Sequence, residues 1–248
     1  EDPALVAGGH MHEGEWSARL GIAGQPAEAE ELMVMRDIAL ARLTGCRIHF
    51  QHLSTARSVA MVREALAAGL PVTAEATPHH FTLTDEQLSG YDPVFKVNPP
   101  LRTEADVAAV RAGLADGTIA TIATDHAPHT PESKELPFDQ APPGMIGLET
   151  ALALALTELD LPLPQLLAAL SWNPAKVAGI DDVHGRPVAE GEPANLCVID
   201  PDATWTVRAD AMASRSRNSP YEGREVRGRV RHTVLAGEPV VIDAEAQR

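Results

Sequence analysis

The sequence predicts an α/β fold that forms part of a (β/α)8 barrel and is followed by a small β-rich appendage. Strand-like and helix-like segments alternate from about residue 27 to residue 180, and after about residue 185 short β-prone runs are split by Gly and Pro. Such alternation is typical of βαβ units and a parallel sheet. Only three or four such units fit, so we expect part of a barrel rather than a whole one.

Five segments are predicted to be helical, chiefly because apolar residues recur in them at helical spacing. In 54–69 a Ser/Thr cap precedes a stripe of Val59, Val62 and Leu66, and Gly69 closes the segment. The first segment has Leu32, Met35 and Leu43 among its apolar residues, and the third has Val107, Val110 and Leu114 on one face. In chain order the five segments are 27–43, 54–69, 104–117, 149–161 and 164–171.

Three segments between the helices are predicted to be strands, namely 46–52, 71–77 and 118–125. No internal repeat or low-complexity segment interrupts the alternation. We therefore assign residues 1–185 to the barrel part and residues 186–248 to the appendage.

Composition argues against several classes of partner. The 248 residues carry a formal net charge of −15, whereas a surface that binds nucleic acid needs a basic face. No run approaches the roughly 18 apolar residues of a membrane span, and no signal peptide is recognised. Cys46 and Cys197 form neither a disulfide framework nor a CxxC zinc site, so we expect a reducing, cytoplasmic location. The chain opens on Glu1-Asp2-Pro3 without Met, as if cut from a longer protein.

The stretch TIATDHAPHT places Asp125 where a predicted strand ends, with His126 and His129 directly after it. Catalytic side chains of parallel barrels sit at the C-terminal ends of strands. A carboxylate there can bind a metal or take a proton from metal-bound water. The alternative is an Asp that only caps the next segment through its side-chain oxygen.

His52 ends another predicted strand, just before a helix cap. Because strand side chains alternate, we expect it to share a face with Ile48 and Phe50, while His49 points to the other face. His52 and Asp125 would converge at one mouth of a barrel, which favours a divalent metal held by N and O ligands, zinc above all. A purely structural role for His52 stays open.

The other histidines fit a metal site less well. His10 and His12 could supply two ligands from one strand face, but GGHMHEGEWS is glycine-flanked and polar, so we expect a surface loop. His79 and His80 follow a strand, where a role beside the metal or at the edge of a substrate stays open. Adjacent residues of an extended strand cannot both face one metal.

Two loops could contact a ligand. In KVNPPLR (96–102) two prolines fix the backbone, while Asn98 presents an amide that donates and accepts hydrogen bonds. A structural turn is the alternative for that loop. In APPGMIG (141–147) Gly144 allows close approach, so that backbone N–H and C=O groups could reach a ligand.

Taken in order, these motifs resemble dihydroorotases of the class I bacterial type, within the amidohydrolase superfamily. The resemblance covers essentially the whole chain and implies a TIM-like amidohydrolase barrel with a small β-sandwich appendage. Single motifs such as NPAK occur throughout the superfamily, whereas the ordered set is specific. The set consists of HEGEWSARLGIAGQP, HFQHLSTARSV, AEATPHHFTLT, KVNPPLRTEAD, ATDHAPHT, APPGMIGLET, NPAKVAGI and GEPANLCVIDP.

The resemblance implies a role for each matched residue. His52 matches a zinc ligand, and Asp125 matches the catalytic aspartate, which also sits on the metal. The positions that contact substrate are matched by Asn98, His129, Pro143 and Gly144, the last two through their backbone. The intact protein would use one or two Zn²⁺ ions to hydrolyse (S)-dihydroorotate reversibly to N-carbamoyl-L-aspartate, a step of de novo pyrimidine (UMP) biosynthesis.

The chain departs from the family pattern at the metal site. The HxHxR motif, an acidic bridging ligand and a further His ligand are absent, so the N-terminal strands of the barrel are missing from it. Because most ligands are lacking, we expect this chain alone to be inactive. The expected partner is the small-molecule substrate, not nucleic acid or a membrane; a homo-oligomer and a complex with aspartate transcarbamoylase stay open.

Two other functions stay open. A sister cyclic amidohydrolase, such as a hydantoinase, dihydropyrimidinase or allantoinase, shares the metal and the base. Its substrates lack the carboxylate that Asn98 and His129 would hold. A non-catalytic dihydroorotase-like subunit is the third reading, although a scaffold has no reason to keep these residues together with His52 and Asp125.

Overall fold

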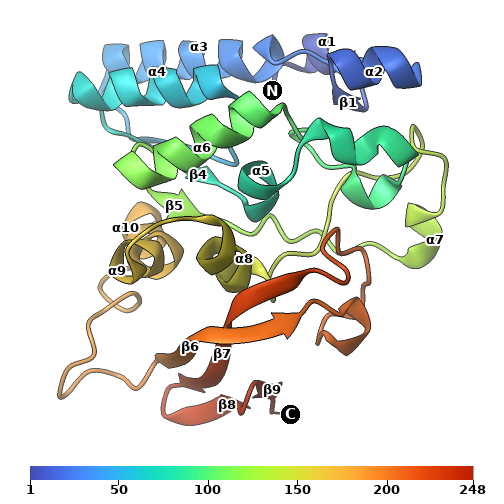
Figure 1. Ribbon diagram of the computed structural model, residues 1–248. Helices are drawn as coiled ribbons and strands as arrows, with labels where there is room; N and C mark the ends of the chain where they lie inside the picture. Colours follow the sequence, from blue (N-terminus) through green and yellow to red (C-terminus); the bar gives the residue numbers. More distant parts are fainter. Residues whose placement is uncertain (248) are drawn as a thin grey trace.

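The computed structural model describes residues 1–247. A three-stranded parallel sheet in the order β3-β4-β5 lies at its centre (Figure 1). Its strands are β3 (Ile48–Phe50), β4 (Val72–Ala76) and β5 (Thr121–Ile122). Ile48 is paired with Val72, and Glu75 with Thr121, so all three strands end at the same edge. The predicted strands are confirmed, each shorter than its segment.

Three long helices lie along one side of this sheet (Figure 1): α3 (Glu28–Thr44), α4 (Ala56–Ala67) and α6 (Glu104–Asp116). The α4 helix begins where the Thr55 hydroxyl accepts the N–H of Ser58. The α6 helix begins with a capping box between Thr103 and Asp106. Both starts agree with the helices predicted from 54–69 and 104–117.

Shorter helical elements fill the connections and the other side of the sheet. The predicted helix 149–161 forms α8, and 164–171 forms α9 with a π-helical turn after it. The elements are α5 (Pro78–Thr82), η1 (Asp85–Gly90), η2 (Pro93–Phe95), α7 (Pro131–Lys134), α8 (Ala151–Glu158), α9 (Leu163–Leu167), π-helical η3 (Ala168–Trp172) and α10 (Asn173–Ala178).

The N-terminal segment forms a small layer of its own beside α3. Strands β1 (Met11–His12) and β2 (Gly24–Gln25) pair in parallel, and the short helices α1 (Pro3–Val6) and α2 (Glu15–Leu20) flank them. The expectation of a surface loop at His10 and His12 is wrong for His12, which is only 8% exposed. The backbone of His12 pairs with β2, and the glycine-rich sequence did not indicate this pairing.

The C-terminal segment forms a four-stranded antiparallel sheet in the order β6-β7-β8-β9. Its elements are β6 (Leu196–Thr206), η4 (Ala209–Ala211), β7 (Glu225–Leu235), β8 (Glu238–Ile242) and β9 (Glu245–Ala246). The β-rich character of the tail is confirmed. The boundary at residues 185 and 186 stays a prediction.

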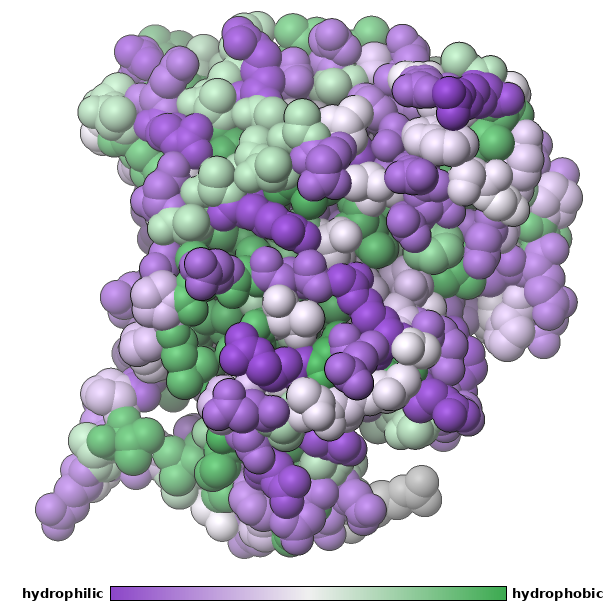
Figure 2. All heavy atoms as spheres, in the orientation of Figure 1, coloured by the Kyte–Doolittle hydropathy of each residue, from purple (hydrophilic) through white to green (hydrophobic). Residues whose placement is uncertain are grey.

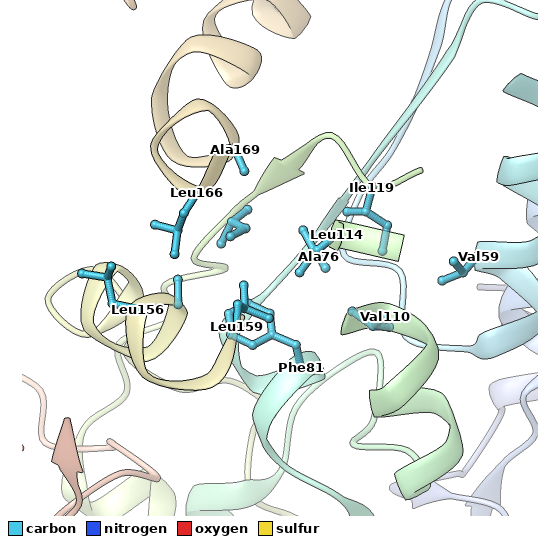
Figure 3. Close-up of a cluster of buried hydrophobic side chains, with 12 residues drawn as sticks. Val59, Ala76, Phe81, Val110, Leu114, Ile119, Leu156, Leu159, Leu166 and Ala169 are labelled. Atoms are coloured by element: carbon cyan, nitrogen blue, oxygen red, sulfur yellow. The ribbon is translucent and has the colours of Figure 1, made fainter. Parts of the chain in front are cut away.

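Two apolar clusters hold these layers together. Between the helices, side chains such as Val110 of α6, Leu156 of α8 and Leu166 of α9 converge on the end of β4 (Figure 3). A second cluster joins Leu154 of α8 to Val226 of β7 and to other residues on both sides. The C-terminal sheet therefore packs on the α/β part through a common core.

The surface retains several apolar side chains. Leu32, Met35 and Leu43 of α3 are 43%, 53% and 80% exposed, whereas Val34 and Ala41 of the same helix are buried. Helical spacing predicted α3 correctly, but its contact with α4 and β3 decides which side is buried. Hydrophilic and hydrophobic residues are interspersed over the face in Figure 2. Within residues 1–247, no helix is long and apolar enough to cross a membrane.

Replacement of Leu154 by Ala should destabilise the protein strongly, because this side chain is fully buried in the core that α8 and β7 share. A buried Leu→Ala change costs about 2–5 kcal/mol of unfolding free energy. Urea unfolding of this chain measures the loss. The matched control is Leu43→Ala at the exposed end of α3, where we expect a change of at most about 0.5 kcal/mol. Equal effects at both positions would contradict the shared core.

Candidate active site at the ends of the parallel strands

Polar residues follow the parallel strands at the edge where these strands end. The turn with His52 comes after β3, helix α5 comes after β4, and the loop with Asp125 comes after β5. Because parallel strands point the same way, the three connections meet at one end of the sheet. This is where the sequence predicted a site.

His52 lies just beyond β3 in a left-handed backbone conformation, with φ at 36°. Its N–H donates to Oε1 of Glu75 at 3.3 Å, and its Nδ1 is buried without a hydrogen-bond partner. The alternation used to place His52 on the face of Phe50 does not extend to His52, because the strand ends at Phe50 and the chain then enters a left-handed turn. Phe50 instead packs in the core beneath α3 and α4.

Asp125 also has a left-handed backbone, with φ at 45°. Burial raises the pKa of its carboxyl group, the nearby His52 opposes this shift, and the Glu75 carboxylate adds to it. The charges of His52 and Glu75 thus act on the Asp125 carboxyl group from the ends of the neighbouring strands. Non-glycine residues with positive φ carry backbone strain and concentrate at functional sites, and here both predicted metal-binding residues show it.

The donor set at this edge fits a divalent metal in part. His52 offers a buried ring nitrogen without another partner, and Asp125 offers a carboxylate at the end of a neighbouring strand. Imidazole nitrogen and carboxylate oxygen are common zinc ligands, and catalytic sites use three protein ligands. Among the described residues 1–247, no group of three or more His, Cys, Asp or Glu could hold a metal. His52 and Asp125 therefore carry donor atoms of the required types, and their role as ligands stays a prediction.

His79 and His80 lie in α5 and are both buried. Nε2 of His80 donates to the carbonyl oxygen of Pro99 at 3.0 Å, and Nδ1 lies 2.8 Å from the Thr77 hydroxyl. Burial lowers the pKa of His80 to about 4, so the ring is neutral near neutral pH. His80 therefore supports the loop of Asn98 from within, while Nε2 of His79 is buried without a partner.

The loop after Asp125 is held against the segment 143–148. Nδ1 of His126 accepts the N–H groups of Gly147 and Leu148, and Nε2 of His129 donates to the carbonyl oxygen of Pro143 at 2.9 Å. A backbone bridge between His126 and Met145 continues this contact. His129 and Pro143, two predicted substrate contacts, are thus neighbours.

Gly144 packs directly against the same loop. A Cβ added to it would lie 2.6 Å from Cβ of Ala127 and 2.9 Å from Nε2 of His129, and its φ is 130°. Its N–H donates to the carbonyl oxygen of Lys96 at 2.8 Å. The missing side chain thus allows close packing of two protein segments. The predicted backbone contact with a substrate stays untested.

Asn98 is exposed and lines a pocket of about 380 Å³ together with Pro143. Other walls of the pocket come from His10, Lys96 and the segment 139–142. Of the six residues chosen from the sequence, His52 and Asp125 lie at strand ends, His129 packs against Pro143 and Gly144, and Asn98 shares the pocket wall with Pro143.

A sequence model of the amidohydrolase family matches residues 36–240. This match covers most of the chain and both loops of the candidate site. The chain belongs to the amidohydrolase family.

Curated relatives of this amidohydrolase carry the name dihydroorotase. The protein from Pelotomaculum thermopropionicum is 53% identical over 98% of the chain, and that from Streptomyces coelicolor is 51% identical over 99%. The chain spans 57% and 58% of the length of these two relatives. The resemblance noted in the sequence is thereby confirmed.

Two solved structures with the same fold carry the names dihydropyrimidinase and L-hydantoinase. Dihydropyrimidinase from Brevibacillus agri superposes with a TM-score of 0.84 at 26% identity, over 90% of this amidohydrolase and 50% of that chain. L-Hydantoinase from Arthrobacter aurescens superposes with a TM-score of 0.85 at 30% identity, over 91% and 51%.

Sequence reasoning missed a buried ionic network behind His52. The carboxylate of Glu30 accepts the backbone N–H and the hydroxyl of both Ser54 and Thr55, which follow His52 in the chain. Arg102, which is 1% exposed, donates to Oγ of Ser54 at 3.1 Å and to Nδ1 of His12 at 3.0 Å. Glu30 is one of three acidic residues in the first turn of α3, so no local pattern marks it as buried.

Two buried lysines anchor the segment that leads to Pro143. Nζ of Lys134 donates to the carbonyl oxygens of Pro93 and Pro142, and Nζ of Lys96 donates to that of Phe138 at 2.7 Å. Burial, together with the nearby Lys96 ammonium, lowers the pKa of Lys134 to about 8. These ammonium groups fix the segment between His129 and Gly144 from inside.

Substitution of Gly144 by Ala should force Ala127 and His129 to move, because the new Cβ overlaps with both and φ is unfavourable. We expect a loss of about 1–3 kcal/mol of unfolding free energy and altered NMR shifts of His129. Gly90→Ala is the control, since nothing lies within 4 Å of its added Cβ. Unchanged His129 shifts in the Gly144 variant would argue against the close packing.

The pH dependence of stability should report on Lys134. Its pKa of about 8 lies below that of an unfolded lysine, so the unfolded chain binds more protons above pH 8 and this group makes the protein more stable as pH rises. The stability difference between the wild type and Lys134→Met, measured by urea unfolding, should therefore grow from pH 7 to pH 9. Lys176→Met, on an exposed stretch of α10, should show no such trend.

Proposed function

We propose that this chain is the C-terminal part of a dihydroorotase, which hydrolyses (S)-dihydroorotate reversibly to N-carbamoyl-L-aspartate in de novo pyrimidine biosynthesis. The observation that carries the proposal is that His52 and Asp125 follow neighbouring parallel strands at one end of the sheet, both in strained conformations, with His129 four residues after Asp125. Curated relatives at 46–53% identity over nearly the whole chain, all named dihydroorotase, support it.

The proposed architecture follows from the same observations. Strands β3, β4 and β5 with their helices would be consecutive units of a (β/α)8 barrel, since they are parallel and joined by helices. Residues 186–248 would belong to a small β-sandwich to which further strands contribute. The cytoplasmic location, a homo-oligomer and a complex with aspartate transcarbamoylase remain predictions.

We assign His52 and Asp125 to the binding of zinc, with the remaining ligands supplied from outside residues 1–248. Bound zinc lowers the pKa of a water molecule and polarises a carbonyl group. The buried Nδ1 of His52 and the adjacent carboxylate are donors of the type that zinc takes. Whether the intact protein holds one ion or two is left open by this donor set.

Asp125 would act as the general base and then as the general acid. It takes a proton from the attacking water, whose oxygen bonds to the ring carbonyl carbon of dihydroorotate. The ring C–N bond then breaks, and Asp125 returns the proton to the leaving nitrogen. A carboxyl group whose pKa is raised by burial, as at Asp125, holds a proton more readily than one in water.

The carboxylate of dihydroorotate would be held by His129 and Asn98. Asn98 lines the pocket of about 380 Å³, and His129 lies within hydrogen-bond reach of its Pro143 wall. Hydrogen bonds to a charged carboxylate orient a substrate well. Pro143 and Gly144 would add backbone contacts through carbonyl oxygens, which can accept a second hydrogen bond.

Hydrolysis by a hydantoinase or dihydropyrimidinase is the alternative function. Solved structures with these names, at 26–30% identity, support this alternative. Those enzymes share the fold over about 90% of this chain. This site can distinguish the two substrates by one group, since dihydroorotate carries a carboxylate and dihydrouracil does not. The distinction therefore rests on Asn98 and His129.

The test compares this chain with a version extended at its N-terminus, where the resemblance places the missing ligands. We expect only the extended chain to bind zinc stoichiometrically and to hydrolyse dihydroorotate, with dihydrouracil hydrolysed far more slowly. In the extended chain, Asp125→Asn should lower kcat by about 10²–10⁴-fold. Asn98→Ala should mainly raise KM for dihydroorotate.

Three outcomes would count against the proposal. Preference for dihydrouracil would favour the sister enzyme. Stoichiometric zinc and activity in the short chain would mean that the ligand assignment is wrong and that the pairs His10/His12 and His79/His80 must be reconsidered. Zinc binding without hydrolysis of either substrate would favour a non-catalytic subunit.

A further inference from the structure

Asn218 lies far from the candidate site in sequence but touches it in space. It belongs to the segment between β6 and β7, within the part of the chain that sequence analysis treated as an appendage. The residue is only 4% exposed. A buried amide is costly unless its polar atoms are paired, so its partners indicate why it is there.

Asn218 connects the two loops of the candidate site. Its Oδ1 accepts the N–H of His129 at 3.2 Å, and its Nδ2 donates to the carbonyl oxygens of Ala127 at 2.9 Å and Gly144 at 3.2 Å. Its own carbonyl oxygen accepts the N–H of Ile146 at 3.1 Å. One residue thus binds two residues of the loop after Asp125 and two of the segment 144–146.

The chemistry of the three side-chain contacts requires an asparagine. The site needs two N–H donors facing carbonyl oxygens and one acceptor facing an N–H, and a primary amide supplies all three at once. An aspartate would keep the acceptor but would place oxygen against the carbonyl groups of Ala127 and Gly144. An alanine would leave all three groups without a partner from this side chain.

The segment that carries Asn218 is itself fixed to the α/β part. The Tyr221 hydroxyl lies 2.9 Å from the hydroxyl of Thr82 at the end of α5. The carboxylate of Glu149 accepts the N–H groups of Ala213 and Ser214 at 2.9 and 3.0 Å. Asn218 is thus held between two anchors and can transmit the position of α5 and α8 to the loops.

We infer that Asn218 is a positioning residue that sets the distance between the loop of His129 and the loop of Gly144. This inference rests on the proposed function, since these loops carry the expected contacts with the substrate carboxylate. Asn218 has no contact with Asp125 in the hydrogen bonds above, so it acts on substrate binding rather than on proton transfer.

The kinetic test uses the N-terminally extended protein with zinc and compares Asn218→Ala, Asn218→Asp and wild type. We expect KM for dihydroorotate to rise by about tenfold or more in both variants, with kcat within about threefold of wild type. The control is Asn195→Ala. Asn195 also accepts a backbone N–H, that of Ala236, but lies exposed and away from the loops. This variant should leave both constants unchanged.

A merely structural role predicts the opposite pattern. Partial misfolding lowers the fraction of active protein, so apparent kcat would fall while KM stays the same, and this result would overturn the inference. An Asn218→Asp variant with wild-type KM would overturn it as well, because the two donated bonds would then not matter.

Hydrogen exchange separates this inference from the proposed function, because it needs no activity and uses this chain as it stands. The N–H of Ala127 donates to Met145 and that of Gly144 to Lys96, so neither is bonded to Asn218. In Asn218→Ala both amides should exchange on the order of tenfold faster, since the loops separate. Unchanged exchange at both would overturn the positioning role. Absence of dihydroorotate hydrolysis in the extended wild type would refute only the proposed function.

Discussion

The parallel pairing of β3, β4 and β5 is the constraint on which the rest of the site depends. Its register places Phe50, Ala76 and Ile122 near one edge, so the chain leaves all three strands at the same end. His52 and Asp125 each follow such a strand end in a left-handed turn. Without the parallel order, residues 73 positions apart would not lie at the same end of the sheet.

Buried polar groups then fix the loops that leave this edge. Glu30 and Arg102 hold the residues after His52, and Lys134 and Lys96 hold the segment that leads to Gly144. Each of these groups must be paired when it is buried, and each finds its partners in backbone atoms or polar side chains of a different segment. Because these buried groups must be paired, they hold the loops in fixed positions. A site that orients a small anion requires loops fixed in this way.

The C-terminal sheet takes part in the same arrangement. Its core is continuous with α8 through Leu154 and Val226, and its connecting segment reaches the loops through Asn218. A segment that reads from its sequence as a separate β-rich unit thus contributes to the geometry of the candidate site. Local pattern cannot show this, because periodicity reports which side of a strand is apolar and not what that side faces.

The sequence by itself determined the alternation of strands and helices, the Ser/Thr cap before α4, and the strand-end positions of His52 and Asp125. These features are local, since they depend on spacing and on side chains that bind their own backbone. Only the tertiary structure decided that His52 leaves the alternation of β3, that Leu43 stays exposed while His12 is buried, and that Asn218 joins two loops. Those outcomes depend on contacts between residues far apart in the chain, which no local pattern encodes.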